Sequence, residues 1–206
     1  MKYFILIFIS LITLVIITSC GLIRTSSADK EKVRIAEEYG GIYVFDKKLR
    51  DEIIQREKER EEARQKVTLG DTFWEQIEAI DKNLPQILSN GCKYFAKGLS
   101  VQEYERTDLS PYKEKIKEYT GEEAYNILHK GLSVSSYYVD KNNKVIPITF
   151  YTYIYDTITT YGLYGDEGAG FRLTNRYSVG IAGGNIFYLE NGKFIKSDEI
   201  RKGERE

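Results

Sequence analysis

The spacing of apolar residues divides the chain into a helical part and a strand-rich part. Between residues 32 and 131, apolar residues recur mostly at steps of three and four, which is typical of amphipathic helices. From Leu132 onward the period changes, and runs rich in Tyr, Thr, Ile and Val predominate. The pattern predicts an α+β fold with N-terminal helices followed by a C-terminal antiparallel β-sheet of about four strands.

Residues 47–66 are predicted to form a charged helix. Its second part, Gln55 to Lys66, consists of helix-forming residues of both charge signs and has no large apolar residue. Such a helix is expected to be solvated on all sides. The alternative is that it serves as a stalk or a docking helix.

A second helix is expected to begin at Thr72, because Thr72 and Glu75 have the spacing of a capping box. Its large apolar residues share one face, so we expect it to pack against a core. These residues are Phe73, Ile77, Ile80 and Leu84. Thr120 and Glu123 predict another capping box, and Gly131 is a suitable residue to end the helix that follows.

The strand-rich part contains turn signals at regular places. Asp140 to Lys144 separates two predicted antiparallel strands, and the glycine-rich segment 162–170 is expected to be a loop. Asn191-Gly192 is the strongest hairpin signal in the chain. The predicted strands are Ser133 to Val139, Val145 to Thr160, Phe171 to Ile181 and Asn185 to Ile195.

Tyrosines provide the candidate binding surface. The chain has 17 of them, and strand alternation places Tyr151, Tyr153 and Tyr155 on one face. Tyrosine combines a large contact area with a polar tip, which suits recognition. The alternative is that helices cover this face. Asp166 and Glu167, in the glycine-rich segment, are further binding candidates, whereas the simpler interpretation makes them the tip of a hairpin.

The N-terminus has the pattern of an export signal. Lys2 precedes an apolar run, Tyr3 to Ile17, that is shorter than the roughly 20 residues of a membrane-spanning helix. The next residues, Ile17-Thr18-Ser19-Cys20-Gly21, resemble the lipobox of bacterial lipoproteins. That resemblance implies cleavage before Cys20 and attachment of diacylglyceryl and palmitate chains to the cysteine, which would anchor the protein to a membrane.

These boundaries define the expected organisation. Residues 1–19 would form the signal peptide, 20–31 a flexible tether, 32–200 a single α+β domain and 201–206 a frayed tail. Cleavage would remove Lys2 and no acid, so 30 basic and 31 acidic residues would become 29 and 31, a net charge near −2. This balance gives no reason to expect a nucleic-acid partner.

The sequence contains little recognisable catalytic chemistry. His129 is the only histidine, no Cys-x-x-Cys pair occurs, and no metal or other cofactor is expected. Cys92 with His129 is the only possible thiol–imidazole pair, so a cysteine-dependent enzyme is an alternative. Ser110-Pro111-Tyr112-Lys113 matches S-x-x-K but lacks its partner motifs, and a helix start accounts for it better.

One further resemblance concerns the globular part. Val67 to Thr72, an amphipathic helix and late antiparallel strands resemble small outer-membrane lipoproteins of the SmpA/OmlA type, although the helices between Ser110 and Gly131 depart from that pattern. This likeness implies a role in outer-membrane assembly. Gly21 after the cysteine, instead of Asp, favours the outer membrane by similarity to enteric lipoproteins.

The sequence therefore predicts a lipid-anchored, non-enzymatic envelope protein. Its partners would be the membrane, through the lipid on Cys20, and another envelope protein or complex. The alternative is binding of a glycan or small ligand by the tyrosines with Asp166 and Glu167.

Overall fold

The computed structural model describes residues 3–5, 8, 10, 24–166, 168 and 170–198. Cys20, the remainder of the expected signal peptide and the expected tail 201–206 lie outside these residues. The chain, including the expected domain 32–200, forms two compact units. The smaller unit comprises Met1–Val33 and Tyr155–Ile181, and the larger comprises Arg34–Ile154 and Ala182–Glu206.

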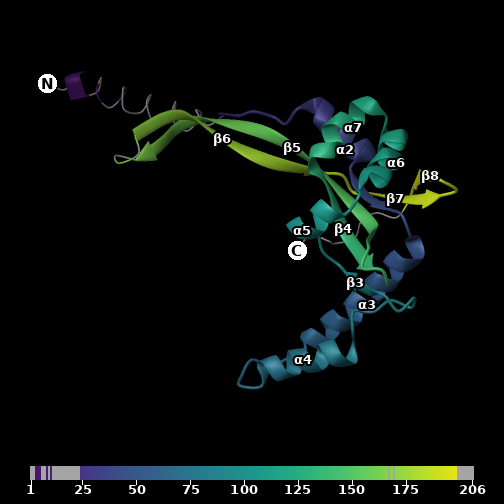
Figure 1. Ribbon diagram of the computed structural model, residues 1–206. Helices are drawn as coiled ribbons and strands as arrows, with labels where there is room; N and C mark the ends of the chain where they lie inside the picture. Colours follow the sequence, from purple (N-terminus) through teal and green to yellow (C-terminus); the bar gives the residue numbers. More distant parts are fainter. Residues whose placement is uncertain are drawn as a thin grey trace. The chain divides into compact units, whose positions relative to one another are not determined.

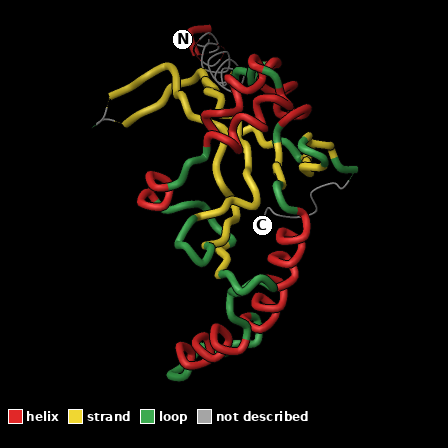
Figure 2. Tube along the Cα trace, turned by 45° about the vertical axis from the view of Figure 1, so that its right-hand side comes forward, coloured by secondary structure: helices red, strands yellow, loops and turns green. Residues whose placement is uncertain are grey.

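A mixed sheet forms the centre of the larger unit (Figures 1 and 2). Its strands follow the order β3-β4-β5-β2-β7-β8. Their bounds are β2 Gly41–Val44, β3 Lys93–Phe95, β4 Leu132–Val139, β5 Val145–Asp166, β7 Asn185–Glu190 and β8 Lys193–Lys196. Asn191 and Gly192, both with positive φ, join β7 to β8 in the expected hairpin.

Strand β2 shows that the predicted sheet was wrong in the number and direction of its strands. It pairs antiparallel with β5 on one side and parallel with β7 on the other, so the sheet has more than four strands and is not purely antiparallel. The helices also do not simply precede the sheet, because β2 lies within the part of the sequence read as helical. All four of its residues are buried, so it lacks the polar alternation that marks a half-exposed strand.

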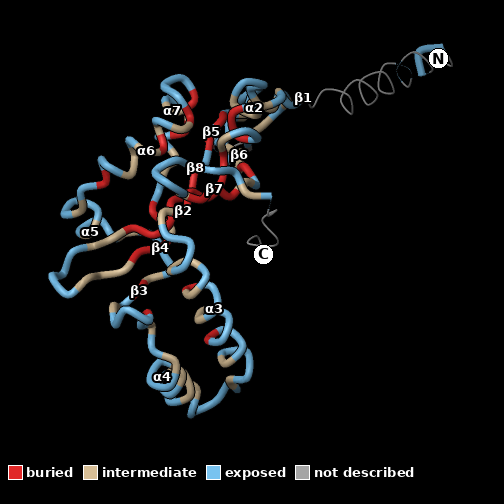
Figure 3. Tube along the Cα trace, turned by 90° about the vertical axis from the view of Figure 1, so that its right-hand side faces the viewer, coloured by how far each residue is buried: buried red, intermediate tan, exposed pale blue. Residues whose placement is uncertain are grey.

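Helices cover one face of this sheet. The core cluster on that face joins Tyr43, Phe150 and Phe187 of three adjacent strands to Leu109 and Ile116 of the helical layer. The opposite face carries a second buried cluster, and Figure 3 shows buried residues concentrated on the central strands. The helices of the described residues, not all of which lie on this face, are α2 Lys30–Tyr39, α3 Lys47–Arg64, α4 Phe73–Asn83, α5 Val101–Arg106, α6 Ser110–Thr120 and α7 Glu122–Leu128, followed by the 3-10 turn η1 His129–Gly131.

The helix starts differ from those expected. The capping box that forms is Ser100 with Glu103 at α5, where each side chain accepts a hydrogen bond from the other residue's backbone N–H. Thr72 makes no side-chain cap bond at α4. Thr120 is still inside α6 and its hydroxyl donates to the Ile116 carbonyl, so both expected boxes are wrong. Spacing alone cannot show which residue leaves the helical conformation.

The smaller unit is built on the outer part of β5. Strand β6 (Gly170–Ala182) pairs with β5, as does β1 (Arg24–Thr25), through Arg24 opposite Tyr161 and Thr25 opposite Thr160. The Asp29 N–H donates to Asp156, so part of the expected tether 20–31 is held against β5. The expected loop 162–170 is also shorter, because β5 continues to Asp166 and β6 begins at Gly170.

Thr152 joins β5 to the start of β2. Its fully buried hydroxyl accepts a hydrogen bond from the Gly41 N–H at 2.8 Å and donates to the Gly41 carbonyl at 3.2 Å. Gly41 has a φ of 148°, and a Cβ there would lie 2.0 Å from the Asn185 carbonyl oxygen. Only glycine permits this close approach of β2 and β7.

We therefore expect Thr152→Val to lower the free energy of unfolding by about 1–3 kcal/mol, because it leaves buried backbone groups of Gly41 without their partner. Urea unfolding followed by circular dichroism would measure the loss. Thr152→Ser is the matched control, since it keeps the hydroxyl. Equal destabilisation by both variants would assign the role to packing instead.

Candidate functional site

The three predicted tyrosines do not form one exposed surface. Tyr151 is buried in the second sheet cluster with Ile42 and Tyr188. Tyr153 is 38% exposed, and its ring lies 4.3 Å from that of Tyr151. In the smaller unit, Tyr155 is 57% exposed. Tyr151 thus belongs to the core, and the two other tyrosines remain accessible.

The acidic candidates cannot be placed in the same way. Asp166 is the last residue of β5, but its side chain lies outside the described residues. Glu167 also lies outside them.

A different exposed surface lies on α4, where sequence analysis expected a core helix. No residue of α4 is buried, and Trp74 is 76% exposed. Leu69, in the preceding turn, is 92% exposed, and the adjacent Thr68 N–H donates to Gln76 of the helix. The apolar residues Phe73, Ile77 and Ile80 are only half-buried. We call these five apolar residues, Leu69, Phe73, Trp74, Ile77 and Ile80, the α4 surface.

The composition of α3 explains why the α4 surface stays open. The two helices lie side by side in Figures 1 and 2. The facing part of α3 has no large apolar residue, so it cannot form a core with α4. A buried arginine joins them instead: Arg60, 4% exposed, pairs with Asp81 at 2.6 Å and donates to the Leu84 carbonyl at the end of α4.

The other end of α3 is attached firmly to the sheet. Asp46 caps it by accepting a hydrogen bond from the Leu49 N–H, and Ile53 packs against Leu88, Tyr94 and Ile148. The Tyr94 hydroxyl also donates to Glu57 at 2.8 Å. The helix is therefore fixed at its beginning by apolar packing and farther along by polar contacts.

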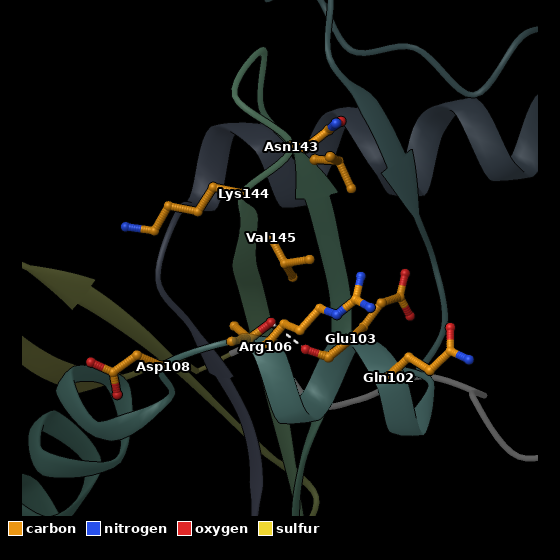
Figure 4. Close-up of a pocket in the computed structure, with 9 residues that line it drawn as sticks. Gln102, Glu103, Arg106, Asp108, Asn143, Lys144 and Val145 are labelled. Atoms are coloured by element: carbon orange, nitrogen blue, oxygen red, sulfur yellow. Dashed lines mark hydrogen bonds between the residues drawn. The ribbon is translucent and has the colours of Figure 1, made fainter.

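A pocket of about 330 Å³ lies beside α5 (Figure 4). Figure 4 shows Glu103 and Arg106 of α5 on one side and, on the other, Lys144 just before β5 and Val145, the first residue of β5. The nine lining residues include two basic and two acidic side chains, and no thiol or imidazole. The pocket is lined mainly by polar and charged side chains and can accept a small polar ligand.

Glu103, an acidic residue of this pocket, already uses its carboxylate in hydrogen bonds within the protein. Its carboxylate accepts hydrogen bonds from the Ser100 hydroxyl at 2.7 Å, the Ser100 N–H at 2.8 Å and the Tyr137 hydroxyl at 2.8 Å. These bonds, those from Ser100 above all, lower the pKa of Glu103. Its role is to hold α5 against β4.

The cysteine–imidazole alternative gains no geometric support. The His129 Nδ1 atom lies 3.1 Å from the Tyr125 carbonyl oxygen of its own helix, while Cys92 lies in the turn before β3 and its N–H donates to Asn90. The two form no hydrogen bond with each other, although both are described residues. The described residues also contain no group of acids, cysteines and histidines suited to a metal ion.

Comparisons with protein-family models, with curated proteins and with solved structures give no match to this chain. In the described part of the chain, no helix is both long enough and apolar enough to cross a membrane.

The Glu103 contacts predict a specific pH dependence. Hydrogen bonding lowers the pKa of Glu103 in the folded protein from its ordinary value of 4.5. Its stabilising effect is therefore complete above that value and is lost as the pH falls through the lower, folded-state pKa. We expect Glu103→Gln to be less stable than wild type at neutral pH, with the difference shrinking in acid.

Urea unfolding of both proteins from neutral to acidic pH would measure this difference. Glu105→Gln, a change at an exposed position on the same helix, is the control and should show no such trend. A difference between Glu103→Gln and wild type that stays constant in acid would mean that ionisation of Glu103 does not stabilise α5.

Proposed function

We propose that this protein is a non-enzymatic lipoprotein of the bacterial envelope that binds another protein through the α4 surface. The observation that carries the binding proposal is Trp74, which is 76% exposed on a helix with no buried residue. Exposed apolar side chains gathered on one element mark interaction sites. The proposal of a membrane anchor is supported by the resemblance of Ile17 to Gly21 to a lipobox.

The α4 surface suits a protein partner better than a small ligand. It is an apolar stripe on one helix and the turn before it, and amphipathic helices bind with such a stripe in the apolar groove of another protein. Tryptophan is among the residues that most often dominate such interfaces. The pocket beside α5, by comparison, has balanced charges and a carboxylate already occupied by protein donors.

Charges around the α4 surface indicate the kind of groove that would fit. Asp71, Glu75 and Glu78 are all exposed near the apolar stripe. Interfaces generally pair charges of opposite sign around an apolar centre. We therefore propose a partner whose apolar groove is bordered by Lys or Arg, and an envelope complex at the outer membrane as its setting.

The anchor is tested by changing its attachment residue. We expect Cys20→Ser to abolish incorporation of a labelled fatty acid, because a hydroxyl is a much poorer nucleophile than a thiolate. Metabolic labelling followed by immunoprecipitation would measure incorporation. Cys92→Ser, the change at the other cysteine, is the matched control and should label like wild type; equal labelling of wild type and Cys20→Ser would refute the anchor.

Binding is tested by site-specific photo-crosslinking in cells. A photoreactive residue at position 74 should give one discrete adduct, identifiable by mass spectrometry, because the partner would cover this site. Val101, 75% exposed on α5, is the control position. Ile77→Ser should reduce the adduct by weakening the apolar contact. Equal adducts from both positions, or none from position 74, would count against the α4 surface.

A further inference from the structure

The hairpin of β5 and β6 exposes several large apolar side chains. In the smaller unit, Leu163 is 70% exposed, Phe171 64% and Leu173 73%. Tyr161 and Tyr177 are 47% and 43% exposed. Several exposed apolar side chains on one hairpin are typical of contact with a protein or a membrane.

Strand β1 connects this hairpin to the N-terminal segment that contains Cys20. Arg24 is paired with Tyr161 of β5. Three residues lie between Cys20 and Arg24, so four Cα–Cα steps limit the distance between their Cα atoms to about 14 Å. Because β1 is antiparallel to β5, the chain enters β1 from the Leu163 end of β5.

This geometry restricts what can lie against the hairpin. If Cys20 carries lipid, its glyceryl group lies at the membrane surface, and Tyr161 must then lie within a short distance of that surface. Leu163 is about 7 Å farther along β5, toward the side from which the anchor arrives. The outer end of the hairpin, which includes Leu163, therefore stays close to the lipid headgroups.

We infer that the β5–β6 hairpin lies on the bilayer that holds the lipid anchor, with Leu163, Phe171 and Leu173 in the interfacial zone. This inference rests on the proposed lipid attachment at Cys20. We assign this contact to the membrane and not to a protein, because the short connection from Cys20 to β1 would bring the membrane to the hairpin whether or not a protein also binds.

The chemistry of the hairpin favours contact from the side over insertion. The sequence at and just after the end of β5 carries the acids Asp166 and Glu167, and burying a carboxylate in hydrocarbon is costly. Among the described strands β6 pairs with β5 alone, so the outer edge of β6 has backbone groups that need water or headgroups as partners. Exposed Arg172 and Arg176 lie on the face of β6 opposite to Phe171 and Leu173, which favours contact of one face with the bilayer over insertion of the whole hairpin.

The experiment uses the acylated full-length protein in phosphatidylethanolamine–phosphatidylglycerol vesicles, with brominated acyl chains as quenchers. Trp74 is the only tryptophan, so Trp74→Phe gives a background in which single probes are introduced. Phe171→Trp and Leu173→Trp place probes on the hairpin. Val101→Trp, at a comparably exposed position in the larger unit, is the control.

Both hairpin probes should shift to shorter emission wavelengths and lose intensity with brominated lipid, whereas the probe at 101 should change little. Hairpin probes that stay unquenched in protein that floats with the vesicles would overturn the membrane contact and leave the anchor intact. Failure of the labelled protein to float would overturn both proposals. A blue shift already present in detergent, and rising with protein concentration, would assign the hairpin to a second copy of the chain instead.

Discussion

The pairing of the short strand β2 on both of its edges is the interaction on which the rest of the larger unit depends. β2 brings β5, which follows the helices, next to β7, which follows the long hairpin. Tyr43 at its centre is fully buried and stacks on Phe187 at 4.6 Å. Gly41 permits the close approach of β2 to β7, and the Thr152 hydroxyl forms hydrogen bonds with the Gly41 backbone. The four residues of β2 therefore join β5 to β7, and their side chains contribute to the core on both faces of the sheet.

The polar composition of α3 leaves the apolar residues of α4 partly exposed. A helix without large apolar residues on its outer part cannot bury a neighbouring apolar stripe, so the pair is joined by Arg60 and its oxygen partners. Arg60 is 4% exposed, whereas its partner Asp81 is 57% exposed, so removing the acceptors would leave a buried guanidinium without its oxygen partners. The helices are therefore held together while the α4 surface stays available for a partner.

The sequence predicted the elements whose signals are local. The Asn191-Gly192 turn, the strands around Asp140 to Lys144 and the charged helix lie where the pattern placed them, the helix as Lys47–Arg64. The predictions that were wrong also share one cause. Thr72 and Thr120 have capping-box spacing but do not cap, and Tyr151 shares a strand face with Tyr153 yet is buried. Each outcome depends on neighbours that are distant in the chain.

The sequence by itself determined the local conformations, since turn chemistry, helix formers and β-branched runs act over a few residues. It also supplied the lipobox-like residues before Cys20, on which the proposed anchor rests. Only the tertiary structure decided that Gly41–Val44 is a central strand, that Glu103 is a structural acid and that α4 remains exposed. Burial is the reason: it is set by which distant segments meet, and four buried residues carry no periodic signal of their own.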